Sequence, residues 1–473
     1  MTSPKSQGPE KASAYGPESS IFIVGASVFG LSSAYHLATA GYSNITVFDR
    51  AESLPTPHAA SNDLNKIIRA EYGVGHATDD FYTDLALEAV EAWSSPDWAS
   101  CFRRTGYVRL ARQTESQKAI KTDMEYFSKP RSQSNENNRW FPPHSFHPLS
   151  TPEDIRQLIP QMIDTDIGEE YQGVLSKYAG YAFASKAIEL LHQRCTDLGV
   201  RFFLGAGGDI TRLLRKPSDQ KLMIGIEASN GCQHLHPPGA SGLTILAMGA
   251  HLPRLLPEAR AQLTAKAWSV AHLELTSSEA GLLKDSPVIS LNDLGFWIEP
   301  VLVKPEEKEA YPYLLKFAAH GGGWTQTLED ASKDQNQGGA TPCSHPPQEP
   351  IYAIPSSDEE LLRKLVRLTL PKVLHDRQFV KKSMCWCADT ASSDFLIDFA
   401  PGYRGLLVAG ADSGHAFKFL PIFGKWVVDV VRIGEQAEER WRWKIGGNRS
   451  DVGDNVAWRG GSVRDLNDVT MTR

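Results

Sequence analysis

The sequence predicts an α/β protein in which a domain built on a parallel sheet is interleaved with a second domain that contains an antiparallel sheet. Three observations predict this fold. A strand–helix–strand unit fills residues 21–49, alternating strands run from residue 268 to residue 320, and a buried strand and an apolar helix return at residues 406–433. Parallel strands need crossover helices and antiparallel strands do not, so the change of pattern indicates two kinds of domain. The 473 residues are enough for two or three domains.

The first unit has clear boundaries. Residues 21–24 are apolar and mostly β-branched, which predicts a buried strand. Residues 25–30 predict a turn, residues 31–40 place apolar side chains at helical spacing, and Gly41 ends this helix. Residues 45–49 predict the second strand. The sequence therefore predicts a complete βαβ unit near its N-terminus.

The later elements follow from the same patterns. Helices are predicted at residues 84–93, 186–198, 358–370 and 422–433, and strands at residues 105–110, 200–203, 243–247, 271–275, 296–303, 313–318 and 406–410. The polar, Pro- or Gly-rich residues 133–148 and 321–350 predict surface loops. We expect a disordered lead-in at 1–18 and a C-terminal tail at 441–473. The domain with the parallel sheet is expected to combine 19–105, 151–255 and 376–440, and the second domain to combine 106–150 and 256–375.

The composition is that of an ordinary globular protein. Lys and Arg number 49 against 56 Asp and Glu, which gives a formal net charge of −7. This balance argues against a nucleic-acid-binding protein and against a basic membrane anchor. The six cysteines are too sparse for a disulfide scaffold, and Cys385-Trp386-Cys387 lacks the spacing of a zinc or thioredoxin site. We assign no metal site and expect reduced thiols.

Residues 21–44 contain no Asp, Glu, Lys or Arg, as a membrane-spanning segment or signal peptide would. The preceding residues are polar and include Glu10 and Glu18, and the stretch itself is rich in Gly, Ser and Ala. We therefore expect neither export nor membrane insertion. The chain ends in Thr-Met-Thr-Arg, which is not a peroxisomal signal of the Ser-Lys-Leu kind. We expect a cytoplasmic protein.

The turn after the first strand carries a phosphate-binding pattern. Gly25, Ser27 and Gly30 stand where a Gly-x-Gly-x-x-Gly fingerprint has its three glycines, and Ser27 is the departure from it. Asp49 ends the second strand, where a carboxylate accepts hydrogen bonds from an unphosphorylated ribose. The helix that follows offers its positive end to a diphosphate. This context predicts a Rossmann-type dinucleotide site, and by itself it leaves FAD and NAD open.

Four further segments carry a family resemblance. They are residues 61–69 (SNDLNKIIR), 315–317 (LKF), 384–390 (MCWCADT) and 410–418 (GADSGHAFK). Together with the N-terminal fingerprint, they closely resemble the monomeric sarcosine oxidase and fructosyl amino acid oxidase (amadoriase) family, which includes pipecolate and saccharopine oxidases. The resemblance extends over about residues 20 to 435, in the same order.

The resemblance implies a flavoenzyme with FAD attached through a cysteine thioether. Such an enzyme oxidises the C–N bond of a secondary amine to an imine, and dioxygen reoxidises the flavin to give hydrogen peroxide. The family's cysteine falls on Cys385; Cys387 is the rival, since residues two apart in an extended segment face the same way. Lys316 falls on the family's oxygen-activating lysine, whose ammonium would stabilise superoxide beside the flavin.

The resemblance also implies a substrate site. Arg69 and Lys418 match the two cations that hold the substrate carboxylate, Lys66 matches an arginine above the flavin face, and His320 matches an active-site histidine. If residues 61–69 were helical, Lys66 would lie one turn from Arg69. His415 precedes the helix whose N-terminus faces the flavin pyrimidine in the family. The further residues expected to bind the cofactor are Val28, Phe29, Arg50, Ser61, Asn65, Gly249, Asp412, Gly414 and Phe417.

The resemblance therefore predicts an oxidase of N-methyl, N-alkyl or cyclic amino acids. Fructosyl amino acids are the alternative substrates. An NAD-linked dehydrogenase, which shares the βαβ fingerprint, is the second class of function. The expected partners are a small amine substrate and dioxygen, with no nucleic acid and no membrane, and the family implies a monomer. A peroxisomal location occurs in the family, but no C-terminal signal supports it here. We expect the loops at 128–150 and 325–350 to shape the entrance.

Overall fold

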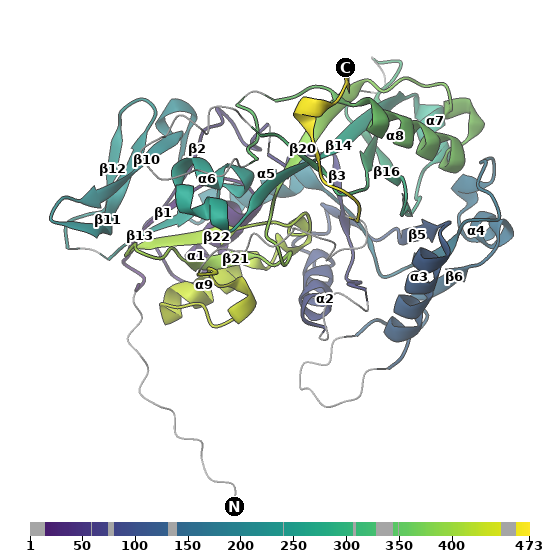
Figure 1. The fold of residues 1–473 in the computed structure, drawn as a ribbon. Coiled ribbons are helices and arrows are strands. Elements are labelled where there is room, and N and C mark those ends of the chain that lie inside the picture. The colour runs from purple at the N-terminus through teal and green to yellow at the C-terminus, as the bar shows by residue number, and fades with distance from the viewer. Residues whose placement is uncertain are drawn as a thin grey trace, which may run out of the picture.

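Two large sheets form the protein. The computed structural model describes residues 15–57, 59–73, 80–130, 140–239, 241–305, 309–327, 344–348, 350–445 and 460–473. Figure 1 shows the two sheets side by side, with the βαβ unit and helix α9 on one side of the molecule and helices α3, α4, α7 and α8 on the other. Residues 1–14 of the lead-in and much of the loops at 128–150 and 325–350 lie outside the described residues.

The first sheet has six strands and is parallel except at one edge. Its order is β21-β22-β13-β1-β2-β9, and only β21 pairs antiparallel. The strands are β1 (Ser20–Val24), β2 (Ile45–Asp49), β9 (Arg201–Leu204), β13 (Gly242–Leu246), β21 (Leu396–Phe399) and β22 (Leu406–Gly410). All residues of β1, β2 and β22 are buried, as in a sheet that is covered on both faces.

Helices cover one face of this sheet. Helix α1 (Val28–Thr39) packs against α5 (Ala184–Asp197) and α9 (Phe423–Ile433). The opposite face meets a three-stranded antiparallel sheet of β10 (Ile210–Lys216), β11 (Asp219–Ala228) and β12 (Gln233–Leu235), whose apolar side chains share a core with β1 and β13. The short helix α6 (Leu252–Leu255) joins this core.

The second large sheet has ten strands. Its order is β23-β18-β14-β17-β16-β15-β5-β7-β6, and β20 also pairs with β14. The strands are β5 (Tyr107–Ala111), β6 (Phe146–Leu149), β7 (Gln172–Ser176), β14 (Thr264–Leu275), β15 (Val288–Leu291), β16 (Gly295–Leu302), β17 (Tyr313–Ala319), β18 (Trp324–Thr325), β20 (Lys381–Asp389) and β23 (Arg464–Asp465). Helices α4 (Pro152–Leu158), α7 (Ser277–Leu282) and α8 (Ser356–Thr369) share its core. The central pairings are antiparallel, as predicted.

A small sheet connects the two parts. It consists of β3 (Asn65–Ile68), β8 (Gly180–Phe183) and β4 (Phe102–Arg103), in the order β3-β8-β4. Helices α2 (Phe81–Trp93) and α3 (Thr114–Phe127) follow β3 and β5 along the chain. Near the C-terminus, β24 (Met471–Thr472) pairs with β19 (Ile354–Pro355).

The predicted fold class is confirmed, and several details differ. Helix α1 begins at Val28 instead of residue 31, and β6 occupies the end of a segment that we expected to be a loop. Strands β7 and β20 come from ranges assigned to the first domain, yet they pair within the ten-stranded sheet. The domain boundaries themselves stay a prediction.

Candidate active site

The predicted phosphate loop joins β1 to α1. Gly25 has a φ of +108°, and an added Cβ would overlap the carbonyl oxygen of Ala247, so the turn requires glycine. A Cβ at Gly30 would overlap the carbonyl oxygen of Gly25, so this glycine lets helix and strand pack closely. The Ser27 hydroxyl hydrogen-bonds that of Ser61, which ties the loop to the segment before β3.

The start of α1 is buried in the core between the first sheet and its helices. Val28 and Phe29 are buried, and the ring of Phe29 lies 4.6 Å from that of Phe423 in α9. The amides of the first helical turn have no partners within a helix, which leaves them available to an anion. The two residues thus help to fix the helix, and their backbone offers the donors.

Asp49 lies at the carboxyl end of β2, as predicted. Its two carboxylate oxygens accept hydrogen bonds from the amides of Ala26 (2.8 Å) and Ala51 (2.9 Å). Each oxygen keeps a lone pair for a further donor. The adjacent Arg50 guanidinium lies 3.4 Å from Nε2 of His251, which follows Gly249 in a short turn after β13. Asp49, Arg50 and Gly249 therefore meet at one edge of the sheet.

Lys316 is buried on β17 and paired with Asp63. Its side chain is 2% exposed, its Nζ forms an ion pair with the Asp63 carboxylate and donates to the carbonyl oxygen of Asn65 at 2.9 Å. Burial lowers the pKa of Lys316 to about 8 despite the attraction of Asp63, and the like charge of Lys66 acts in the same direction. Burial alone would raise the pKa of Asp63, but Lys316 and Lys66 hold it well below its usual value. Asp63 is therefore a carboxylate shared by two lysines.

Lys66 connects this cluster to Cys385. Its Nζ lies 2.9 Å from Asp63 Oδ2 and 3.9 Å from the Sγ of Cys385 on β20. Burial would lower the pKa of Lys66, but Asp63 and the Cys385 thiol raise it above its usual value. A hydrogen bond from Cys387 lowers the pKa of Cys385, and Lys66 contributes in the same direction. Lys66 therefore lies at contact distance from the Cys385 thiol.

The helical spacing considered for Lys66 and Arg69 does not apply. Lys66 and Arg69 do not lie one helical turn apart, because residues 65–68 form strand β3, paired with β8. Lys66 extends toward Asp63 and Cys385, whereas Arg69 follows the strand and lies against Tyr72 and Tyr107, with its Cζ 6.0 and 5.6 Å from the ring centres. The two cations therefore belong to different clusters, Lys66 with Asp63 and Cys385, and Arg69 with Tyr72.

The second cluster is organised by Tyr72. The Lys418 ammonium donates to the Tyr72 hydroxyl at 3.1 Å and lies 4.3 Å from the centre of its ring. The hydroxyl lies 2.8 Å from Nδ1 of His415, and Nε2 of His415 lies 2.8 Å from the carbonyl oxygen of Ser393. A carbonyl only accepts, so Nε2 carries the proton and Tyr72 donates to Nδ1. Burial, and then the charge of Arg69, depress the pKa of Lys418 well below its usual value.

The remaining predicted residues flank these clusters. Burial lowers the pKa of His320 to about 4, and Arg69 is near enough to add to the shift. Asp412 accepts from the amides of Ala388 and Gly414, both at 2.8 Å, which ties the loop after β22 to β20. Phe417 and Lys418 begin the turn Phe417–Phe419 that follows this loop.

Sequence reasoning missed Asp63, Glu71 and Tyr72. Asp63 lay inside a quoted motif but was not assigned a role, because a lone carboxylate next to a strand has many explanations. Glu71 carried no signal, since its partner Ser176 is far away in the chain. A tyrosine three residues after a predicted substrate cation was the only available hint.

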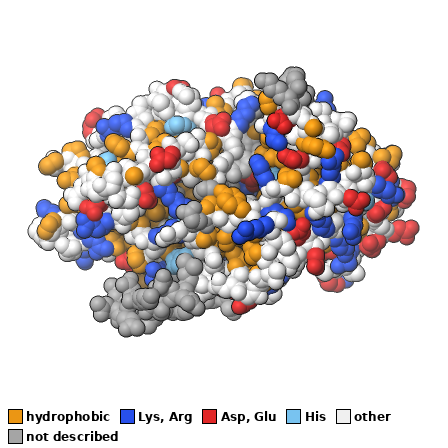
Figure 2. Space-filling model, turned by 90° about the horizontal axis from the view of Figure 1, so that it is seen from above, with side chains coloured by type: hydrophobic (Ala, Val, Ile, Leu, Met, Phe, Trp, Pro, Cys, Tyr) orange, Lys and Arg blue, Asp and Glu red, His pale blue; other side chains and the backbone are white. Residues whose placement is uncertain are grey.

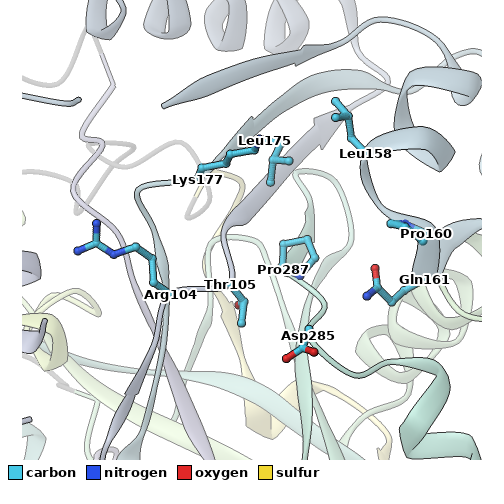
Figure 3. Close-up of a pocket in the computed structure, with 9 residues that line it drawn as sticks. All are labelled: Arg104, Thr105, Leu158, Pro160, Gln161, Leu175, Lys177, Asp285 and Pro287. Atoms are coloured by element: carbon cyan, nitrogen blue, oxygen red, sulfur yellow. The ribbon is translucent and has the colours of Figure 1, made fainter. Parts of the chain in front are cut away.

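One cavity lies apart from the two clusters. A cavity of 390 Å³ is lined by residues from the turns around β5, β7 and β15 and from α4, and Figure 3 shows Arg104 turned away from its centre. None of its nine lining residues belongs to the two clusters. We assign it no part in the active site.

Three further observations concern the surface, the helices and possible metal ligands. Figure 2 shows acidic and basic side chains interspersed over the face seen from above. Within the described ranges, no helix is long and apolar enough to cross a bilayer. Over the same residues, no group of three His, Cys, Asp or Glu side chains is placed to hold a metal ion.

Comparisons with known proteins extend over almost the whole chain. L-saccharopine oxidase of Schizosaccharomyces pombe is 30% identical over 95% of this chain and 97% of its own. Peroxisomal sarcosine oxidase of Mus musculus is 23% identical over 86% of this chain and 90% of its own.

Solved structures are also similar to this chain over almost its whole length. Fructosyl amine:oxygen oxidoreductase (amadoriase I) of Aspergillus fumigatus superimposes with a TM-score of 0.81 and 27% identity, over 98% of this chain and 99% of its own. Amadoriase II of the same organism has a TM-score of 0.80 at 27% identity, over 97% and 98%.

The family model described as FAD dependent oxidoreductase matches residues 20–430. The βαβ fingerprint left two cofactors open, and this match supports FAD over NAD. The chain belongs to the FAD-dependent oxidoreductase family.

Proposed function

We propose that this enzyme oxidises the C–N bond of an amino acid with a secondary amine, N-methyl, N-alkyl or cyclic, to an imine. The observation that carries the proposal is the meeting of Arg69 and Lys418 at the ring of Tyr72, joined by β3 to the Lys66–Lys316–Cys385 cluster. FAD, when bound, supplies the two-electron acceptor and passes the electrons to dioxygen, which yields hydrogen peroxide.

The residues present fit FAD. The loop at Gly25 has no room for a Cβ, Asp49 keeps acceptor capacity for a ribose, and the buried Oδ1 of Asn65 has no hydrogen-bond partner among the described residues. A buried unpaired oxygen of this kind calls for a donor from a ligand. In the proposal, Cys385 holds the flavin by a thioether bond, because its lowered pKa favours the reactive thiolate.

The substrate carboxylate would lie between Arg69 and Lys418. Arg69 can offer a two-pronged guanidinium and Lys418 a compact charge. Lys418 has a depressed pKa in the free protein, and an arriving carboxylate restores its preference for the proton. Tyr72 and His415 hold its ammonium in place. This pairing selects acids.

The same two cations would also favour the neutral form of the substrate amine. An ammonium that enters a buried site beside Arg69 and Lys418 meets like charge and loses water, and both effects lower its pKa. The neutral amine needed for oxidation then forms without a dedicated base. Lys316 would stabilise negative charge that develops on dioxygen, since its ammonium is fixed by Asp63 and Asn65.

A peroxide-coupled screen tests the proposal. The purified holoenzyme is offered N-methylglycine, pipecolate, saccharopine and fructosyl amino acids, and peroxide is measured with each. We expect release with at least one secondary-amine acid, and a loss of affinity for that acid in Arg69→Ala. Full affinity in Arg69→Ala would remove the carboxylate argument.

Fructosyl amino acids are the second candidate substrates. The extended structural similarity to amadoriases I and II favours them. The screen separates the candidates, because a fructosyl amino acid oxidase would release peroxide with the glycated compounds and not with pipecolate. The expected monomeric state and cytoplasmic location belong to the proposal, and sedimentation of the holoenzyme and cell fractionation test them.

A further inference from the structure

A small cavity lies on the side of Arg69 that faces β5, β7 and α3. Its volume is 20 Å³, and it is lined by Arg69, Glu71, Arg109, Asp123 and Ser176 together with apolar side chains. A space of this size holds one group as large as a water molecule, provided that polar partners surround it. The cavity therefore suits a single donor or acceptor atom beside the proposed carboxylate site.

Glu71 supplies an acceptor that the protein does not use. Its side chain is 8% exposed, and one carboxylate oxygen accepts a hydrogen bond from the Ser176 hydroxyl. The other oxygen, Oε2, is buried and has no hydrogen-bond partner among the described residues. A buried carboxylate with a single neutral hydrogen bond is costly, since the lost hydration is not replaced.

The neighbouring cations make hydrogen bonds of their own, although the charge of Glu71 also acts on Lys418. The Arg109 guanidinium donates to Asp123 at 2.6 Å, in an ion pair whose side chains are 16% and 12% exposed. Arg69 donates to the backbone carbonyl of Glu71, and its guanidinium lies against two tyrosine rings. Oε2 therefore needs a donor from outside the described residues.

We propose that Glu71 is a specificity residue that accepts a hydrogen bond from a donor, an ammonium or a hydroxyl, on the N-substituent of the substrate. The inference rests on the proposed function, because Arg69 anchors the substrate carboxylate next to this cavity. It narrows the substrate class to amino acids whose nitrogen carries a polar substituent, and it disfavours those with a plain alkyl group.

The test uses three series of N-substituted glycines matched in chain length: aminoalkyl, hydroxyalkyl and plain alkyl. Peroxide release by the holoenzyme gives kcat/KM for each. Glu71→Gln keeps the size of the side chain and removes its charge. Glu125→Gln is the control. It makes the same substitution at an exposed position of α3, the helix that carries Asp123.

We expect the wild type to prefer at least one donor-bearing series over the alkyl series by about tenfold, which corresponds to about 1.4 kcal/mol. Loss of an ammonium preference in Glu71→Gln identifies a cationic substituent; a hydroxyl preference should fall only in part, since the glutamine oxygen still accepts. Glu125→Gln should leave the ratios unchanged.

Two results would overturn the inference while the proposed function survives. The first is equal kcat/KM for all three series in the wild type, and the second is an unchanged donor preference in Glu71→Gln. Absence of peroxide with every series and with N-methylglycine would instead count against the proposed function itself.

Discussion

At the scale of single residues, the central feature is one carboxylate shared by two buried ammonium groups. Asp63 pairs with Lys66 and Lys316, yet the two lysines respond in opposite directions: the pKa of Lys66 is raised and that of Lys316 is lowered to about 8. The difference follows from their surroundings. Burial is the largest single effect on both lysines, but for Lys66 it is outweighed by Asp63, Cys385 and Cys387, whereas Lys316, which is 2% exposed, also meets the like charge of Lys66. Lys316 is thus the lysine whose charge responds to pH in the neutral to alkaline range.

The pKa of Lys316 leads to a pH prediction. A lysine with a pKa of about 8 is charged below that pH and loses its proton as the pH rises through it. If its ammonium promotes the reaction with dioxygen, the second-order rate constant for flavin reoxidation should fall as the pH rises through about 8. Stopped-flow reoxidation of the reduced enzyme measures this constant.

Lys316→Met should lower this rate constant by roughly 100-fold and abolish its pH dependence. Lys372→Met, at an exposed lysine, is the control. A reoxidation rate in Lys316→Met equal to that of the wild type would show that the lysine has no part in the oxygen reaction.

Tyr72 gives a second prediction. Tyr72→Phe removes the hydroxyl that accepts from Lys418 and donates to His415, while the ring beside Arg69 stays. Hydrogen bonds to charged groups contribute roughly 1.5–3 kcal/mol, so KM for an acid substrate should rise about tenfold or more with a smaller change in kcat. Tyr403→Phe, whose hydroxyl contacts Glu258 far from this cluster, should leave both constants unchanged. An equal loss of kcat and no change in KM would argue against a role in holding the carboxylate.

At the scale of elements, the sequence predicts what is locally periodic and apolar. The buried strands β1, β2 and β22 and the amphipathic helices α8 and α9 were predicted to within about three residues. Helix α3 was missed, because only Ile120, Asp123 and Phe127 of its fourteen residues are buried. The β10–β11 hairpin was missed for a related reason: few of its side chains are fully buried, and both strands carry charged residues. Packing against distant parts of the chain determines these elements, and a local sequence pattern does not contain that information.

The C-terminal segment offers a prediction at this scale. Asp358 of α8 is 3% exposed and accepts from Ser269 of β14 (2.6 Å), Trp324 of β18 (2.8 Å) and Arg464 of β23 (3.1 Å). Asp358→Ala leaves two buried donors unpaired, so it should lower the free energy of unfolding by roughly 2 kcal/mol or more. The thermal midpoint of the holoenzyme should fall, and that of Asp376→Ala, at an exposed carboxylate, should not. Equal midpoints for Asp358→Ala and wild type would mean that this contact does not stabilise the end of the chain.

At the scale of the whole molecule, the candidate site depends on four distant parts of the chain. Residues 63–72, strand β17, strand β20 and the loop after β22 converge there, because β20 pairs with β14, β14 with β17, and the small β3 sheet lies alongside. The family resemblance pointed to several residues that the structure places there, among them Lys316, Cys385 and Lys418, but not to Asp63 or Tyr72. It did not predict the division into a Lys66–Lys316–Cys385 cluster and an Arg69–Lys418 cluster, since that division depends on β3 being a strand.

The most direct test of the account is the mass of the intact polypeptide after acid precipitation of the holoenzyme. We predict a yellow precipitate, a mass increased by one flavin adenine dinucleotide, and a modified peptide within residues 384–390; Cys385→Ala should lose the added mass, and Cys387→Ala should keep it. An unmodified, colourless polypeptide, or a flavin that stays attached in Cys385→Ala, would contradict the proposal that Cys385 tethers the cofactor beside Lys66 and Lys316.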